Sequence, residues 1–345
     1  MIPELSGDES VLRSTLNGRV DMSQRIETKS EGNDGGEVKF QKRKFSLASV
    51  LLPIFFLFLH QIVLNAMAFL RIYLYAKNTG LAGEELMRVF TRPDLFYQYL
   101  LASDAQNYAS LLAMLILIPV YLLYLFWRRR KDSDIVRLQR QGIVSYFESV
   151  VLIIGTLGLT QLWMAFLLLF EEADNFIGKA LRDYLIQAEM LTSEEGSLWL
   201  QVISLVVLVP IAEELLFRGI LQGELSLRFS RTTRVLVCSV VFAVFHFDLI
   251  QGSYVFLAGI VLSLAYELTN NLLVPVFMHM VFNFIGGGIL QRVFNLDEQG
   301  AGILLILLFV FIPLALAVLA IWFRRDKEKR EKEIYGLYND LSGKI

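Results

Sequence analysis

Long runs of apolar residues, interrupted by few charges, recur along this chain and constrain its fold more than any other feature. Inside a bilayer no water is present to bond backbone N–H and C=O groups, so such runs must form helices that satisfy these groups internally. Crossing the hydrocarbon core takes about 20 apolar residues at a rise of about 1.5 Å each. A hydrophobic share of 55% and a mean hydropathy of +0.53 exceed the values of ordinary soluble domains. We therefore predict an all-α, polytopic membrane protein.

Eight stretches are apolar enough to be predicted as membrane spans, although the fifth and sixth are short. Every second connection is basic, such as "QKRK" before the first span and "RRRKDSDIVRLQR" after the second, whereas "EEADNFIGKALRDYLIQAEMLTSEEG" is acidic or mixed. Because basic loops mark the cytoplasmic side of a membrane, we predict that both termini are cytoplasmic. The predicted spans are 45–70, 111–127, 150–170, 198–221, 235–250, 254–268, 272–293 and 303–323.

Composition divides the chain into four predicted regions. The first is a tail of mixed charge that contains "EGNDGGE" and lacks a secretory signal, so we expect it to be disordered and cytoplasmic. The single cysteine, Cys238, forms no intrachain disulfide and supplies no cysteine metal cluster. The regions are the tail 1–44, three spans with their loops in 45–196, a core of four spans in 197–293, and the last span with a basic cytoplasmic tail in 294–345.

Polar side chains within the predicted spans are functional candidates, because an ionisable group at mid-membrane costs several kcal/mol. Three of them stand together in "EELLFRG". Glu214 and Arg218 are four residues apart with the acid first, the favourable order for an ion pair on one helix face. Glu213 is rotated by about 100° from Glu214 and is left without a partner on its own helix. The complete set is His60, Glu213, Glu214, Arg218, His246, Glu267, His279 and Asn283.

Spacing along the helices predicts that four of these groups meet. His279 and Asn283 are four residues apart and therefore share a helix face. From the rise per residue, Glu213, His246 and Asn283 each lie about 16 Å from the cytoplasmic surface, and His279 lies about 10 Å from it. This estimate requires that the fourth span continue as a helix through "RGILQGE".

A carboxylate, two imidazoles and an amide at a common depth suit hydrolysis. Glu213 would act as a general base on water that attacks a carbonyl carbon. His246 would hold the same water or give a proton to the leaving amine. His279 and Asn283 would donate hydrogen bonds to the developing oxyanion.

The three polar motifs resemble the CPBP family of intramembrane proteases, which includes the type II CAAX prenyl endopeptidases and bacteriocin-processing or immunity proteins. They are "EELLFR", "FAVFH" and "HMVFN", in the order of the family, and the similarity covers 197–290. The resemblance implies endopeptidase activity within the bilayer and an active site between the fourth, fifth and seventh spans. It also implies these roles: Glu213 and His246 activate water, Glu214 and Arg218 support them, and His279 and Asn283 form the oxyanion site.

Several alternatives stay open at this point. The resemblance favours catalysis without a required cofactor, but Glu213, His246 and His279 are also a ligand set that suits catalytic zinc. A non-catalytic scaffold or immunity protein is a second alternative, and a transporter is disfavoured because the chain shows no internal repeat. His60 is expected to have a packing or cavity role, Glu267 to extend to the membrane interface, and Cys238 to pack as a small apolar residue.

The sequence also indicates which partners the protein has and where it is located. We expect a membrane-associated or lipidated peptide or protein as substrate, with the bilayer as surroundings and no nucleic acid. Prenylated CAAX proteins, bacteriocin leaders, signalling-peptide precursors and remnant membrane peptides are all candidate substrates. A bacterial plasma membrane is the expected location.

Overall fold

The computed structural model describes residues 46–130, 135–192 and 197–342, and the structural statements below concern these residues. They form helices throughout, without a β-strand, and one isolated bridge joins Leu138 to Asn271. Phe45–Arg324 is one compact unit, and the residues from Arg325 onward belong to a second unit. The all-α prediction is confirmed, whereas the predicted tail 1–44 lies outside the described residues. The other predicted domain boundaries stay predictions.

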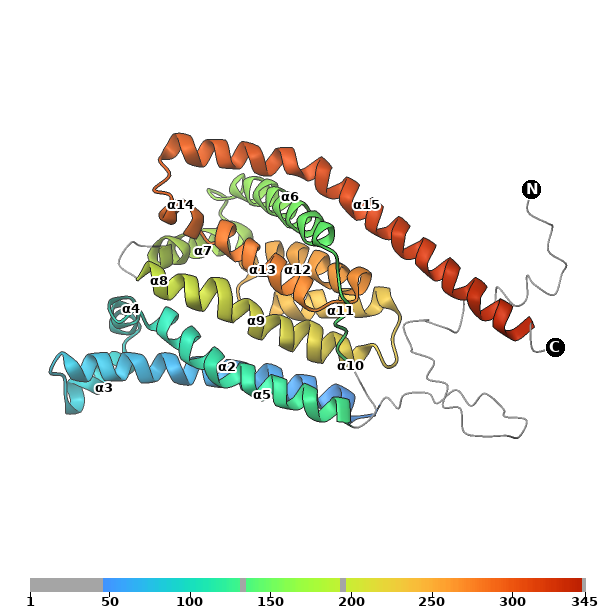
Figure 1. Cartoon of the computed structure of the whole chain (residues 1–345). Coiled ribbons are helices and arrows are strands. Elements are labelled where there is room, and N and C mark those ends of the chain that lie inside the picture. The colour runs from blue at the N-terminus through green and yellow to red at the C-terminus, as the bar shows by residue number, and fades with distance from the viewer. Residues whose placement is uncertain (1–45, 131–134, 193–196, 343–345) are drawn as a thin grey trace. The chain divides into compact units, whose positions relative to one another are not determined.

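Six of the described helices are long and apolar enough to cross a membrane (Figure 1). One of them, Leu198–Leu225, is a composite of several helical segments. The other five are α2 (Ala48–Asn78), α5 (Ala105–Arg130), α6 (Ile143–Leu168), α12 (Leu249–Thr269) and α15 (Glu298–Ser342). The shorter helices are α3 (Gly83–Thr91), α4 (Pro93–Ala102), α7 (Phe176–Thr192), α11 (Arg231–Val244), α13 (Leu273–Gly286) and α14 (Ile289–Val293).

The six long helices match six of the eight predicted spans. The fifth and seventh predicted spans correspond to α11 and α13, which have 14 residues each. Both are shorter than the roughly 20 residues that a full crossing needs. The seventh ends early because Gly288 adopts a left-handed backbone with φ +71°, and α14 starts after it. An integral membrane protein is supported, and the number of eight crossings stays a prediction.

The composite helix contains two π-helical segments between its α-helical ones. It consists of α8 (Leu198–Gln201), η1 (Val202–Leu208), α9 (Val209–Glu214), η2 (Leu215–Gln222) and α10 (Gly223–Leu225), and both η segments are π-helices. Pro210, near the start of α9, has no N–H and clashes with the carbonyl four residues before it, which explains the widened turn η1. The composite helix continues through "RGILQGE", as the depth argument requires.

The composite helix lies at the centre of the compact unit (Figure 1). The neighbouring helices α2 and α5 pack against it on one side, whereas α11 and α13 contact it from the other side. The helix α6 packs on α12 and α13. Gly155 and Gly158 of α6 lie against the backbone of α15 near Phe311 and Leu308, so an added Cβ has no room there.

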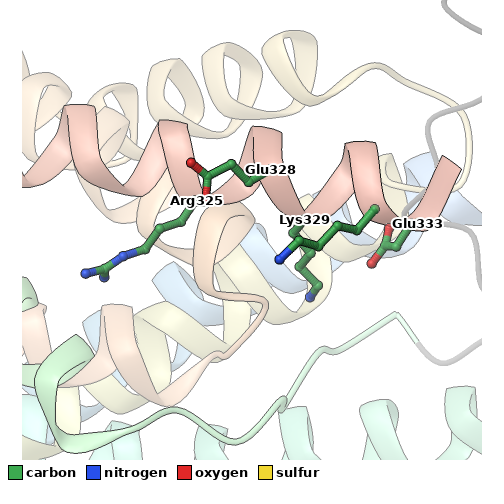
Figure 2. Close-up of a pocket in the computed structure, with 5 residues that line it drawn as sticks. Arg325, Glu328, Lys329 and Glu333 are labelled. Atoms are coloured by element: carbon green, nitrogen blue, oxygen red, sulfur yellow. The ribbon is translucent and has the colours of Figure 1, made fainter. Parts of the chain in front are cut away.

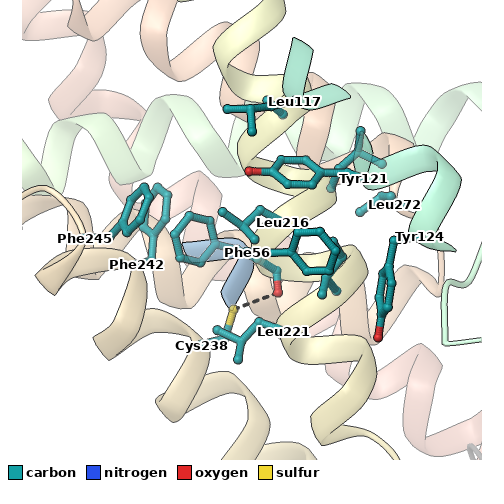
Figure 3. Close-up of a cluster of buried hydrophobic side chains, with 14 of the residues drawn as sticks. Phe56, Leu117, Tyr121, Tyr124, Leu216, Leu221, Cys238, Phe242, Phe245 and Leu272 are labelled. Atoms are coloured by element: carbon teal, nitrogen blue, oxygen red, sulfur yellow. Dashed lines mark hydrogen bonds between the residues drawn. The ribbon is translucent and has the colours of Figure 1, made fainter. Parts of the chain in front are cut away.

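Aromatic side chains fill the space between α2, α5, the composite helix and α11. Figure 3 shows Phe56 and Tyr121 in the same cluster as Phe242 and Phe245. Phe56 lies 4.9 Å from the ring of Tyr124 and 5.7 Å from that of Tyr121. This cluster anchors the first two long helices to the segment that carries the polar motifs.

Cys238, within the same cluster, is fully buried, and its thiol donates to the carbonyl of Phe217 at 3.3 Å. The packing role predicted for this cysteine is confirmed.

The part of α15 in the second unit carries a shallow depression on its surface (Figure 2). Its lining is formed by exposed charged side chains, and none of the motif residues takes part. These side chains are Arg325, Glu328, Lys329, Lys332 and Glu333.

Candidate active site

Glu214, Arg218 and His279 form a direct buried network. Nη1 of Arg218 donates to Oε1 of Glu214 at 2.6 Å, as the four-residue spacing predicts. The same oxygen lies 2.9 Å from Nδ1 of His279 on α13. Glu214 and Arg218 are 0% exposed, and His279 is 4% exposed. The second carboxylate oxygen of Glu214 has no hydrogen-bond partner among the described residues.

Arg218 is fixed by three different groups. Besides Glu214, it donates from Nη2 to the backbone carbonyl of Gly259 at 3.1 Å, and its guanidinium lies 4.8 Å from the centre of the Phe242 ring. A Cβ at position 259 would lie 3.2 Å from that ring, so glycine permits the close approach of α11 and α12 here. Arg218 therefore ties the composite helix to both of the following helices.

Glu213 has a different environment from its neighbour. Its side chain is 12% exposed, and its Oε2 lies 3.7 Å from Nε2 of His279. This is its one ion-pair contact within 4 Å among the described residues, and no arginine reaches it. Glu213 thus keeps carboxylate lone pairs available for a further group, as a general base must.

His279 lies between the two acids, with one ring nitrogen toward each. Nδ1 lies against Glu214, and Nε2 lies on the side of Glu213. A neutral imidazole donates from one nitrogen only, so it donates from both only when it is protonated. In its protonated form, His279 would donate toward the Glu213 side while it stays bonded to Glu214.

His246 lies on a turn, so its predicted position within a helical span is wrong. The helix α11 ends at Val244, Phe247 adopts a left-handed backbone with φ +55°, and Asp248 caps the start of α12. Nδ1 of His246 lies 2.8 Å from the carbonyl oxygen of Phe242, and its ring contacts the Phe242 ring at 5.0 Å. The ring of His279 contacts Phe242 too, at 5.8 Å, so this phenylalanine contacts both imidazoles.

Asn283 is held by a carbonyl that the composite helix leaves free. Its Nδ2 donates to the oxygen of Leu205 at 2.8 Å. The N–H of Val209 bonds to Ser204 instead, and Pro210 has no N–H, so Leu205 lacks both donors that a helix normally offers. Because Pro210 has no backbone N–H, the Leu205 carbonyl remains available to the Asn283 amide. This proline is visible in "PIAEELLFRG", but the spacing of the polar residues does not indicate that it leaves a carbonyl available to Asn283.

Two polar groups outside the motifs are paired with each other between the first two long helices. His60 of α2 and Tyr121 of α5 are bonded, with 3.1 Å between Nδ1 and the hydroxyl oxygen. His60 was visible in the sequence as a polar residue in an apolar run, whereas nothing in the sequence pointed to Tyr121.

Glu267 does not extend to the membrane interface, and that expectation is wrong. The side chain is 0% exposed and accepts hydrogen bonds from Arg234 at 2.7 and 3.0 Å, from Arg137 at 3.1 Å and from Gln222 at 2.8 Å. Arg137 comes from the segment after α5, and Arg234 comes from α11. Charged donors to both carboxylate oxygens offset part of the cost of burying this charge.

No group of three or more His, Cys, Asp or Glu side chains in the described part of the chain has the arrangement of a metal site. Of the zinc ligands considered from the sequence, Glu213 and His279 are adjacent, whereas Nδ1 of His246 is engaged by a backbone carbonyl. Nε2 of His246 would be the nitrogen available to a metal in a zinc site made of these three residues.

Comparison with known proteins identifies the segment that carries this site. Residues 195–285 match the family model described as type II CAAX prenyl endopeptidase Rce1-like. No curated protein and no solved structure matches the chain significantly. The matched segment contains Glu213, Glu214, Arg218, His246, His279 and Asn283. The match agrees with the resemblance to the CPBP family that the three motifs indicate, and it covers 195–285.

Proposed function

We propose that this protein is an intramembrane endopeptidase that hydrolyses a peptide bond in a membrane-associated or lipidated peptide, with Glu213 as the general base. The observation that carries the proposal is the unequal environment of the two adjacent acids. Glu214 is engaged by Arg218 and His279, whereas Glu213 faces an imidazole and no arginine among the described residues. The Rce1-like match supports a protease and makes prenylated CAAX peptides the first substrate class to test.

In the proposed reaction, Glu213 accepts a proton from a water molecule as the water oxygen attacks the carbonyl carbon of the substrate. The new C–O bond places negative charge on the carbonyl oxygen. The C–N bond then breaks, and the amine leaves with the proton that Glu213 or His246 returns to it. General-base catalysis of this kind accelerates reactions by about 10²–10⁴-fold.

The neighbouring polar groups have supporting roles in this proposal. His279 and Asn283 stabilise the oxyanion, and Glu214 with Arg218 holds His279 in place. One N–H of the Asn283 amide is bonded to the Leu205 carbonyl, and its second N–H would donate to a substrate oxygen. His246 lies on a turn next to Phe242, where a small movement of the turn would bring its ring toward the attacking water.

The test uses purified protein in lipid nanodiscs and an internally quenched peptide that ends in a farnesylated CAAX sequence. The wild type should cleave it, Glu213→Gln should not, and Glu85→Gln, which changes an exposed acid on α3, should cleave at the wild-type rate. Comparison of membrane-peptide fragments between wild-type and Glu213→Gln cells extends the test to other substrates. Equal fragments and equal phenotype in both strains would favour a non-catalytic scaffold and contradict the proposal.

A further inference from the structure

The motif residue Asn283 lies in the last turn of its helix, where the helix alone fixes a side chain poorly. The helix α13 has 14 residues and ends at Gly286. Carbonyl groups in a last turn lack intrahelical donors, and helix ends open more easily than helix centres. A group that stabilises an oxyanion must be held accurately, because a displacement of about 1 Å can cost about 100-fold in rate. Asn283 therefore needs support from outside α13.

The chain folds back on Asn283 directly after α13. The N–H of Gly287 donates to the carbonyl of Asn283 at 3.0 Å, and Gly288 turns the chain with its left-handed backbone. A Cβ at position 287 would lie 2.6 Å from that carbonyl oxygen, so glycine permits the close approach. The N–H of Arg292, on α14, then donates to the Gly288 carbonyl at 3.2 Å. Two backbone hydrogen bonds around this turn thus join Asn283 to Arg292.

The side chain of Arg292 returns to the composite helix. Its Nη1 donates to Oε1 of Gln201 on α8, and Gln201 is 7% exposed. Gln201 lies four residues before Leu205, whose carbonyl accepts from Nδ2 of Asn283 at 2.8 Å. Residues four apart share a helix face, and α14 packs on α8 while α13 packs on η1. The two side-chain bonds therefore attach the α13–α14 segment to one face of the composite helix, on both sides of the turn.

A second arginine makes a bond of similar kind away from the site. Arg71 of α2 donates from Nε to the carbonyl of Ser103, directly after α4, at 2.8 Å. Like Arg292, it is partly buried and ties two helical elements together. Neither of its partners belongs to the composite helix or to α13. Removal of this bond is a control for a loss of stability that leaves Asn283 in place.

We propose that Arg292 and Gln201 are positioning residues for Asn283. Their bond holds the α13–α14 turn against the composite helix, so that one N–H of the Asn283 amide stays on the Leu205 carbonyl and the other faces the substrate oxygen. Arg292 lies beyond the segment 195–285 that matches the family model, so the site includes a residue from outside that segment. The catalytic consequence rests on the proposed function, whereas the attachment of Asn283 does not.

The first experiment measures the attachment without substrate. Protein labelled with ¹⁵N-asparagine in lipid bilayers gives side-chain amide signals, and Asn283→Asp assigns the signal of Asn283. Arg292→Leu and Gln201→Leu should each shift or broaden this signal, whereas Gln201→Glu, which keeps an acceptor for Arg292, should largely preserve it. The control Arg71→Leu should leave it unchanged. An Asn283 signal that responds to neither leucine variant would overturn the inference.

The second experiment measures catalysis on the farnesylated peptide or on a peptide identified in the cell comparison. Arg292→Leu and Gln201→Leu should lower kcat by about 5–50-fold, less than the roughly 10²–10³-fold expected of Asn283→Ala. KM should change by less than about twofold, because the oxyanion forms only in the transition state. Gln201→Glu should keep most of kcat. A comparable loss of kcat in Arg71→Leu would indicate general destabilisation and contradict the positioning role.

A double-mutant cycle decides whether the effect passes through Asn283. In an Asn283→Ala background, Arg292→Leu should lower kcat no further, because the group that it positions is already absent. A further loss of about tenfold in that background would refute the inference, as would a wild-type kcat of Arg292→Leu beside an impaired Asn283→Ala. Both results leave the proposed function standing, whereas an active Glu213→Gln would refute the proposed function itself.

Discussion

Two buried clusters of side chains around acids both include residues of the composite helix. They differ in how completely their carboxylates are hydrogen-bonded. Around Glu267, both oxygens accept from Arg137 or Arg234, and Gln222 adds a third donor. At the motif site, Arg218 and His279 bond to one oxygen of Glu214, whereas Glu213 faces an imidazole at 3.7 Å. The first arrangement ties helices together, whereas the second leaves Glu213 without a guanidinium partner among the described residues. Burial of charge alone therefore does not distinguish the two.

The largest expected effect is on cleavage by a Glu213→Gln variant. Because the amide cannot accept the proton of the attacking water, the cleavage rate should fall by about 10²–10⁴-fold. The unfolding temperature in detergent should change by less than about 4 °C, since no arginine among the described residues pairs with this acid. The cleavage rate and the unfolding temperature should be measured on the same preparation of this variant. If Glu213→Gln were as strongly destabilised as we expect for Glu267→Gln, the proposed difference between the two acids would be contradicted.

Glu267→Gln should show the opposite pattern. Removing this charge leaves buried Arg234 without its anion, which should cost about 3–5 kcal/mol of unfolding free energy. The cleavage rate per folded molecule should stay close to that of the wild type. Thermal unfolding combined with an active-fraction measurement tests this. If folded Glu267→Gln protein were inactive, the division into a structural cluster and a reactive site would be wrong.

Arg218→Lys should give an intermediate result in both measurements. Lysine keeps the charge but does not reproduce the fork that bonds Glu214 and the Gly259 carbonyl together. We expect about a tenfold loss of rate and a loss of about 1.5–3 kcal/mol in stability, the range of a hydrogen bond to a charged group. An unchanged rate would show that Glu214 and His279 need no support from this guanidinium.

Pro210→Ala should have a smaller effect, confined to the reactive site. Alanine supplies an N–H that can bond to the Leu205 carbonyl and compete with Asn283. The expected change in cleavage rate is about 2–10-fold, the worth of one neutral hydrogen bond. Pro313→Ala in α15 is the matched control and should leave the rate unaltered. Equal effects of both substitutions would point to general helix distortion instead.

Removal of metal ions with a chelator should have the smallest effect on the cleavage rate. If Glu213 acts without a metal, protein dialysed against a strong chelator should keep its cleavage rate within about twofold, because general-base catalysis needs no Lewis acid. Elemental analysis of the same sample should find no stoichiometric zinc. Loss of activity that zinc alone restores would favour the alternative in which Glu213, His246 and His279 bind the metal.

Local spacing predicted part of the site correctly. The interval of four residues identified the Glu214–Arg218 pair, and the depth estimate brought Glu213 and His279 together. Both predictions depend on regular helix geometry and on no knowledge of tertiary packing. The apolar runs likewise sufficed for the fold class, because a bilayer leaves a chain few backbone options.

Predictions that depended on helix ends or on distant partners were less successful. The apolar run around His246 predicts a continuous helix, and the cap that Asp248 forms within this run gives no distinct signal. The position of Glu267 near a predicted helix end suggests the interface, and its partners Arg137 and Arg234 are too remote in sequence to be predicted from spacing. The His60–Tyr121 pair depends on how α2 and α5 pack, which no spacing encodes.

The central claim is that Glu213 performs chemistry whereas Glu267 holds the fold. One ratio tests it most directly: the cleavage rate per folded molecule of Glu267→Gln divided by that of Glu213→Gln, on the same peptide and in the same nanodiscs. We predict a ratio of about 100 or more, the lower end of the general-base contribution. A ratio near one would contradict the claim.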